Sequence, residues 1–592
     1  MSNDRRVSNG RCVEPRVGWA ALALAVAGVA VVYMAALLTL PPSVFWSPDE
    51  GAKFIQMHSR LDARVPHGLP YVAASHDPLY TFYPAAPIYP QPLWPSGSRC
   101  HWPSTFPSVV LPFFRLFGLW GLYIVPVACG ILAALLAGLL AGRLAPGAAV
   151  PGVLIAGLGS PLFFHSVLFL EHSLACALGL GALLCGVAVA RGAIPRRVAC
   201  GLSALACLLG MLALRTEALV FVVATGIGWM VALRRRRLWL FGGLCVLTLL
   251  AWPVVQSLAR SGDATRAAEL AADIAPALAG LRDSALWCEL PRHALHVLVN
   301  NPEESGAPLF AAWAVAGGAG LGLCILTPLL LPRLRFRVWL FGCGLVAVAS
   351  GVCLCSPERY RAVHGLLLPM PAVVLAWLPA EAGRRHEDGA GRWLRALLPA
   401  FVGVYLVATW LMRRPAGGPE WGLRYALMAY LLSAILGAAA LANWMRTCRG
   451  LRRAAGVAGA AALLAISGGY GIRGIIEQQV TKRDLQAFER EVIEARCPVV
   501  TDEWWLAAAL APAFVRTEFY TLRPGGELNQ WIERTGQHAG PFLYVSYGPL
   551  PEPGDGPFAL TLTQRRIVQE MRFSTYEIAT RDGANALFTG SR

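Results

Sequence analysis

Long apolar stretches separated by short polar turns fill most of the 592-residue chain. Each stretch is close to the roughly 20 residues that an α-helix needs to cross the hydrocarbon core of a bilayer. The first stretch, residues 17–40, is too long for the core of a signal peptide. The pattern predicts an α-helical polytopic membrane protein with about thirteen spans, at residues 17–40, 120–142, 147–165, 171–190, 198–214, 217–233, 238–258, 308–331, 338–355, 362–380, 396–412, 423–444 and 454–472.

The placement of arginine predicts the orientation of these spans. Residues 1–16 carry four arginines, which puts them in the cytoplasm under the positive-inside rule. The turns expected on the same side are rich in arginine, as at residues 234–237, whereas the short turns on the other side are poor in it. Because the number of spans is odd, the C-terminus is expected outside.

The composition is typical of a membrane protein and does not indicate nucleic acid as a partner. Hydrophobic residues make up 56% of the chain and charged residues 15%, whereas soluble domains carry about 25% charged residues. The net charge of +16 is expected to follow the topology, so it indicates membrane lipids rather than nucleic acid as the surroundings. Almost all of the positive charge is arginine, and the two lysines are Lys53 and Lys482.

Three long segments are expected outside the membrane. Residues 41–119 form a first loop rich in proline and aromatic residues, and proline blocks long helices and strands. Residues 259–307 have a helical pattern. The chain from residue 473 loses the apolar stretches and reaches its end at residue 592 as a soluble-type segment.

This last segment has the pattern of a small α/β domain with a partly parallel sheet. It contains no GxGxxG motif or P-loop, so the sequence predicts no nucleotide there. We therefore divide the chain into a cytoplasmic N-terminus (1–16), a transmembrane domain (17–472) and an outer domain (473–592). The outer domain is expected to have strands at residues 498–501, 513–516 continuing into 519–521, and 542–546, with helices at 502–511 and 526–535.

The stretch from Trp46 to Lys53 follows the first span and combines two structural signals. Ser47-x-x-Glu50 is a capping box with Pro48 at the first helical position, which predicts a short helix from Pro48 to about Arg60. Asp49 and Lys53 are spaced as a favourable helix ion pair. Two adjacent carboxylates beside a bilayer are costly unless they are solvated, paired or used, so a helix start and an active site are compatible interpretations.

Further ionisable groups lie at the same ends of other spans. Glu171 and His172 open the fourth span, although an acid at a helix N-terminus is also favoured by the helix dipole alone. The remaining groups could equally form a turn ion pair or interfacial anchors. The remaining groups are Arg215, Glu217, Glu358, Arg359, Tyr360, Arg361 and His364. Together with Glu171 and His172, these residues are expected on one face of the membrane, which predicts that they lie close together in the folded protein. His58, His67, His76 and His101 lack metal-ligand spacing and are interpreted as loop histidines.

These residue types suit the transfer of a sugar from a lipid phosphate. The planar guanidinium of arginine can hold a phosphate through two hydrogen bonds. A phosphate leaving group departs without protonation, so the protein needs chiefly a carboxylate that takes the proton of the acceptor, as in inverting glycosidases.

The pattern resembles a known superfamily. Its marks are the carboxylate pair after the first span, the acid at Glu171, the Arg215-x-Glu217 turn, and Arg359-Tyr360 before a span that contains Pro369. Together with the long first loop, they are similar to the GT-C membrane glycosyltransferases. The nearest branch is that of the aminoarabinose transferases and protein O-mannosyltransferases.

The resemblance implies transfer from a polyprenyl-phosphate-linked sugar to a lipid, glycan or protein acceptor, with inversion. It implies a multi-pass protein of the bacterial inner membrane that reacts on the periplasmic face. Some members use a divalent metal ion and others do not, so a metal cofactor is an open alternative. The implied catalytic residues are Asp49, Glu50 and Glu171; the implied donor-phosphate ligands are Arg359, Tyr360, Arg215 and Lys53; and His172, Glu217 and Arg361 are implied in binding sugar or acceptor.

Two other functions fit parts of the pattern. A transporter or flippase of a lipid-linked saccharide would also need arginines and apolar spans, but it should show repeats or broken helices, and no internal symmetry is visible. A non-catalytic assembly protein would use the outer domain for docking, so its function would depend more on residues 480–592 than on Asp49.

Overall fold

The computed structural model of the chain describes most of the helical body and the C-terminal sheet. The described residues are 18–61, 71–84, 105–191, 194–215, 218–232, 248, 293–294, 297–298, 315–325, 335–355, 366–367, 369–378, 389–411, 424–522, 528–535, 540–547, 558–568 and 571–580.

The helical body belongs to a multi-pass membrane protein. Eight helices of the described residues are long and apolar enough to cross a bilayer. The count of thirteen spans stays a prediction, because parts such as residues 238–247 lie outside the described residues. The long helices are α1 (Trp19–Leu38), α4 (Gly121–Leu144), α7 (His172–Arg191), α8 (Ile194–Leu214), α14 (Arg335–Cys355), α15 (Gly389–Leu411), α16 (Leu427–Thr447) and α17 (Gly450–Ala495), and α9 (Ala218–Ala232) is shorter.

Two expected spans differ from a single α-helix. Residues 147–165 form two helices, α5 (Ala149–Leu158) and α6 (Leu162–Ser166), separated by Gly159-Ser160-Pro161. In residues 362–380, the described helix is the short 3-10 helix η4 (Pro371–Trp377). Proline at its start disfavours a helical conformation in the residue before it, which agrees with a helix that begins at Pro371.

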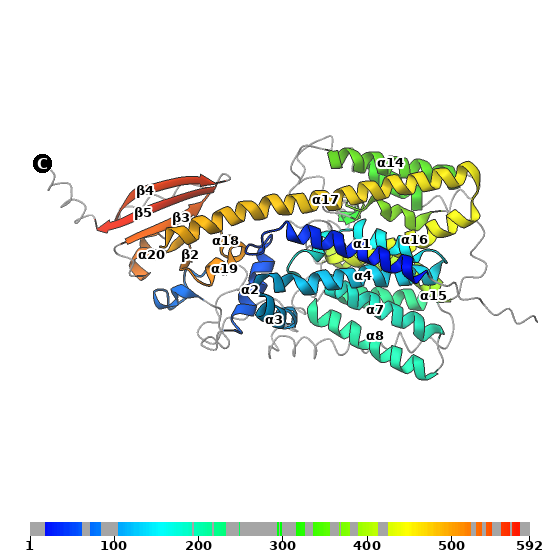
Figure 1. Cartoon of the computed structure of the whole chain (residues 1–592), viewed down its shortest axis with the longest axis horizontal. Coiled ribbons are helices and arrows are strands. Elements are labelled where there is room, and N and C mark those ends of the chain that lie inside the picture. The colour runs from blue at the N-terminus through cyan, green and yellow to red at the C-terminus, as the bar shows by residue number, and fades with distance from the viewer. Residues whose placement is uncertain are drawn as a thin grey trace, which may run out of the picture.

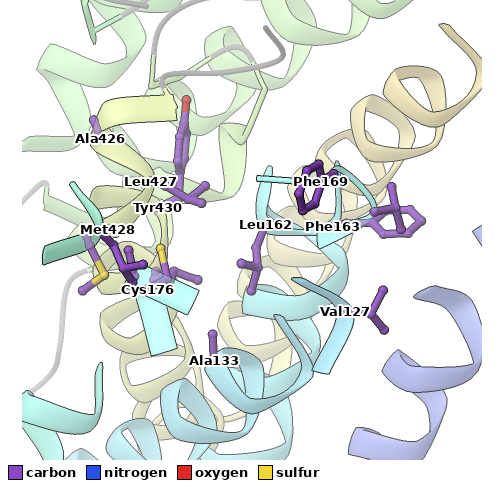
Figure 2. Packing of buried hydrophobic residues seen from close by; sticks show 14 of the residues in the cluster. Val127, Ala133, Leu162, Phe163, Phe169, Cys176, Ala426, Leu427, Met428 and Tyr430 are labelled. Carbon is purple, nitrogen blue, oxygen red and sulfur yellow. The ribbon is translucent and has the colours of Figure 1, made fainter. Parts of the chain in front are cut away.

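Helix α16 lies at the centre of the bundle. In its most apolar window 89% of the residues are buried, against 28% for α1. Helices α4 and α5 pack closely through glycine, since a Cβ added at Gly138 would lie 2.5 Å from Val153 Cγ2. Small residues allow such approach between membrane helices. Figure 2 shows part of this core, with Cys176 of α7 beside Met428 of α16.

A layer of short helices covers the end of the bundle nearest the sheet (Figure 1). The expected helix after the first span is confirmed as α2 (Pro48–His58), with its capping box formed, and it ends two residues before Arg60. Helix α3 (Thr105–Phe117) packs against α2 and leads through η2 (Gly118–Trp120) into α4. Between α2 and α3 in the sequence, the described part of the first loop contains the 3-10 helix η1 (Val72–Ser75).

Helix α17 joins the bundle to the C-terminal domain without interruption (Figure 1). Its 46 residues correspond to about 69 Å at 1.5 Å per residue, roughly twice the hydrocarbon thickness. The expected last span, 454–472, therefore continues as one helix past residue 473. It stops at Arg496, whose φ of 48° is left-handed.

The C-terminal sheet is partly parallel, as predicted. Its order is β2-β1-β3-β5-β4, with β1 parallel to β2 and β3, and β5 antiparallel to β3 and β4. The prediction of a strand at 513–516 was wrong, because helix α19 covers its start, and the helix expected from residue 502 begins only at Leu506. The elements are β1 (Val499–Thr501), α18 (Leu506–Ala509), α19 (Ala511–Phe514), β2 (Phe519–Thr521), α20 (Leu528–Thr535), β3 (Gly540–Ser546), β4 (Phe558–Val568) and β5 (Met571–Thr580).

Candidate active site

The first turn of α2 directs its two acids to different surroundings. Glu50 is fully buried, and its carboxylate accepts the backbone N–H of Ser47 at 3.1 Å and that of Phe169 at 2.7 Å. One oxygen thus completes the capping box, and the other fixes α2 to the turn that precedes α7. These bonds make Glu50 a structural anchor of α2.

Asp49 faces the start of α16 instead. Its Oδ2 lies 2.6 Å from Nη1 of Arg424, and the two side chains are 22% and 13% exposed. Arg424 opens the 3-10 helix η6 (Arg424–Ala426), which leads directly into α16. The sequence analysis missed Arg424. The available signal was an arginine at the start of the expected span 423–444, on the side where the turns are poor in arginine.

Glu171 lies immediately before α7 and pairs with two cations. Oε2 lies 3.1 Å from Lys53 Nζ, and Oε1 lies 3.1 Å from Arg215 Nη1. The side chains of Glu171 and Lys53 are 5% and 3% exposed. Lys53 comes from the second turn of α2 and Arg215 from the end of α8, so this one carboxylate joins three elements that are far apart in the sequence.

These cations determine the ionisation of Glu171. Burial alone would raise the pKa of the carboxyl group, but Lys53 and Arg215 outweigh it and lower the pKa of Glu171 to about 2. Glu171 is therefore a carboxylate at neutral pH and a weak proton acceptor. Its effect is to hold the two cations in place.

Arg215 also contacts the next residue, His172. Its Nη1 lies against Nδ1 of the ring and 3.2 Å from Nε2. His172 is 2% exposed, and its ring centroid lies 4.9 Å from that of His165. The structure thus brings together the expected groups Lys53, Glu171, His172 and Arg215.

A small pocket lies beside this cluster. Its polar wall consists of His172, Arg215 and Arg424. The rest is apolar and includes Cys176 and Met428, whose adjacent side chains are seen in Figure 2. Two cations at one side of an apolar cavity suit a ligand with an anionic head and an apolar body.

A second buried cation, Lys482 of α17, lies behind α2. It is fully buried, its Nζ donates to the Tyr123 hydroxyl at 3.0 Å, and it lies 5.0 Å from the centre of that ring. The Glu50 carboxylate is near enough to interact with it electrostatically. The two lysines of the chain are thus both buried next to the acids of this region.

Six of the expected site residues belong to other segments of the chain. Glu217, Glu358, Arg359, Tyr360, Arg361 and His364 lie outside the described residues.

The acids of the site are poorly suited to a resident metal. Within the described ranges, no three His, Cys, Asp or Glu side chains gather as metal ligands would. Asp49 and Glu171 already pair with arginine or lysine, and a bound cation would have to displace those partners.

The chain was compared with known families, proteins and solved structures. No protein-family model and no curated protein matches the chain. The chain is similar to ArnT from Cupriavidus metallidurans in the apo state, at 13% identity and a TM-score of 0.49 over 94% of this chain and 98% of ArnT. The form of ArnT bound to undecaprenyl phosphate gives 13% identity and a TM-score of 0.44 over 95% and 98%.

A third similar structure is the oligosaccharyltransferase AglB from Archaeoglobus fulgidus, in complex with an inhibitory peptide and a dolichol-phosphate. It has 12% identity and a TM-score of 0.43, over 89% of this chain and 69% of AglB. ArnT, an aminoarabinose transferase, and AglB are both GT-C glycosyltransferases, the superfamily that the sequence resembles. At these identities and scores, the function proposed next rests on the residues of the chain itself.

Proposed function

We propose that the protein is a membrane glycosyltransferase that moves a sugar from a polyprenyl-phosphate donor to a lipid, glycan or protein acceptor, with inversion at the anomeric carbon. The observation that carries the proposal is the pocket in which Arg215 and Arg424 face apolar walls while Asp49 contacts Arg424. A lipid phosphate has the matching halves, an anionic head and an apolar chain.

The two arginines are proposed to bind the donor phosphate. Each presents a planar guanidinium, and Glu171 holds Arg215 in place. As the bond between the anomeric carbon and the phosphate oxygen breaks, negative charge grows on the leaving phosphate, and fixed cations stabilise it. Arg359 and Tyr360, from outside the described part of the chain, are proposed as further ligands.

Asp49 is proposed as the base. The acceptor hydroxyl attacks the anomeric carbon from the face opposite the phosphate, its proton passes to the Asp49 carboxylate, and the polyprenyl phosphate leaves as an anion. Glu171 is a poorer base, because its two ion pairs lower its pKa to about 2. When the donor phosphate binds Arg424, that arginine has a second anion to contact, and the Asp49 carboxylate becomes more available to the acceptor.

The remaining proposals concern the residues that contact sugar or acceptor and the orientation of the protein in the membrane. His172, with Glu217 and Arg361, is proposed to contact sugar or acceptor. The site is proposed to face the periplasm of a bacterial inner membrane, with the N-terminus in the cytoplasm and the domain of residues 473–592 on the periplasmic side.

The test is sugar transfer by the purified full-length protein in liposomes. The donors are polyprenyl phosphates carrying radiolabelled sugars, and the acceptors are a lipid extract, a glycan fraction and a protein fraction of the bacterial envelope. Asp49→Asn keeps the size of the side chain and removes the base, so kcat should fall by about 10²–10⁴. Glu491→Gln, which changes the acid of a surface ion pair with Arg566, should keep the wild-type rate.

The transporter interpretation predicts a different result in the same liposomes. A flippase would move the labelled lipid between leaflets without passing the sugar to any acceptor, and Asp49→Asn would leave this movement unchanged. Normal transfer by Asp49→Asn would contradict the assignment of the base.

A further inference from the structure

Helix α2 touches the C-terminal domain at the level of the backbone. A Cβ added at Gly51 would lie 1.7 Å from the carbonyl oxygen of Ala508 in α18. Real Cβ atoms never approach an oxygen this closely, so no side chain fits at position 51 unless one of the helices moves. Just before α2, the backbone N–H of Phe45 donates to the carbonyl of Ala509 at 2.9 Å.

The far part of α17 holds the same region from another direction. The hydroxyl of Ser43 donates to Glu489 Oε2 at 2.6 Å. About two turns earlier in α17, the buried Lys482 donates to Tyr123 and interacts with Glu50 of α2. The segment from Ser43 to Gly51 is therefore fixed by α17 and α18.

The C-terminal domain also holds the described part of the first loop. The backbone N–H of Thr521, at the end of β2, donates to the carbonyl of Phe82 at 2.8 Å. His76 lies 3.3 Å from Glu518, just before β2. Both contacts connect β2, at the edge of the sheet, to the first loop, which also contains α2.

From these contacts we propose that Gly51 is a positioning residue, through which the C-terminal domain sets the place of Asp49 in the active site. Gly51 lies two residues after Asp49 in the first turn of α2. Its bare Cα lets the helix dock directly on the backbone of α18. The domain is thus a part of the catalytic apparatus, and the contact at Gly51 fixes the distance from Asp49 to the pocket.

The geometry makes this contact important for rate. A misplacement of about 1 Å can cost on the order of 100-fold in rate when reacting groups are held by a rigid site. Accommodating a Cβ at position 51 requires a shift of more than 1 Å, because ordinary van der Waals contact begins at 3.4 Å and the available distance is 1.7 Å.

The first arm of the test does not depend on the reaction. Hydrogen–deuterium exchange of the full-length protein is measured by mass spectrometry for wild type, Gly51→Ala and Gly28→Ala. The control adds the same methyl group within α1, where nothing lies within 4 Å of the new Cβ. Gly51→Ala should raise exchange in α2 and α18 by about tenfold through local opening, while α4 and the control stay as in wild type. Unchanged exchange in α2 would overturn the proposal.

The second arm rests on the proposed function and uses the transfer assay. Gly51→Ala should lower kcat by about 10–100-fold with KM for the lipid donor within about threefold, because the donor contacts Arg215 and Arg424 outside α2. A loss confined to KM, or no loss, would overturn the positioning role. If wild type itself transfers no sugar, the proposed function fails, and the exchange result still decides whether the domain holds α2.

A milder pair of variants covers the case in which Gly51→Ala does not fold. Ser43→Ala removes the hydrogen bond to Glu489, and Ser43→Thr keeps a hydroxyl at the same position. Ser43→Ala should raise exchange in the first turn of α2 and lower kcat by about threefold, because the hydrogen bond to Glu489 that helps to hold this segment is lost. Ser43→Thr should restore both values. Equal behaviour of the two variants and wild type would contradict the proposal.

Discussion

The starts of α2 and α7 carry acids of opposite character. Asp49 in α2 is partly exposed and pairs with Arg424 at the wall of a pocket. Glu171 before α7 is buried between Lys53 and Arg215. The first acid can meet a substrate, whereas the second holds other side chains. The contrast shows that the role of a carboxylate at a helix start depends on which cations the fold places beside it.

Removing the charge of Glu171 should have the largest effect on stability. Glu171→Gln leaves the buried Lys53 without its carboxylate, and breaking a buried ion pair costs about 3–5 kcal/mol. Thermal unfolding in detergent measures the change. A loss below 1 kcal/mol would remove the contrast between the two acids.

The dependence of stability on pH should sharpen the same contrast. The pKa of Glu171 is lowered from 4.5 to about 2 in the folded chain. Its contribution is therefore fully present above pH 4.5 and is lost as the pH falls toward about 2. At about 1.4 kcal/mol per unit, this amounts to about 3 kcal/mol. Unfolding measured from pH 5 to pH 2 should show a steeper loss for wild type than for Glu171→Gln, and parallel curves would contradict the assignment.

Substitution of Glu50 should cost less stability than substitution of Glu171 and more than substitution of Asp49. Glu50→Gln replaces a carboxylate oxygen by an amide NH₂ that faces a backbone N–H, at either Ser47 or Phe169. The expected loss is about 1–2 kcal/mol, as for a lost helix cap or buried hydrogen bond. The free energy of unfolding measures it. A variant as stable as wild type would show that the anchoring of α2 does not depend on this carboxylate.

Asp49→Asn should change stability least, by less than about 1 kcal/mol, because its ion pair with Arg424 is partly solvated. The large effect expected for Asp49→Asn is the loss of kcat in the transfer assay. A variant that loses several kcal/mol of stability would place Asp49 in the same class as Glu171.

The sequence predicted much of this arrangement because local signals agreed with each other. The capping box and Pro48 predicted α2, and the charges at the span ends predicted that Glu171 and Arg215 would meet. These signals depend on spacing within a few residues or on which end of a span a residue occupies. Both properties can be derived from a single sequence.

The other features depend on tertiary contacts. Pairing of Asp49 with Arg424 joins residues 375 positions apart, and no local pattern selects that partner. The helical continuation of α17 past residue 473 was missed because polar residues replace the apolar stretch there while the backbone remains helical. The hairpin β4–β5 was also missed, although Leu560 and Leu562 alternate with Thr561 and Thr563 in its outer strand as strand residues do.

The scarcity and burial of lysine predict a low reactivity of the folded chain toward amine-specific reagents. Both lysine side chains, Lys53 and Lys482, are at most 2% exposed, so an amine-reactive succinimidyl ester should reach neither of them in the folded protein. Acylation of either lysine then reports the opening of the region around α2 specifically, and a mass spectrometer can follow it without any engineered label.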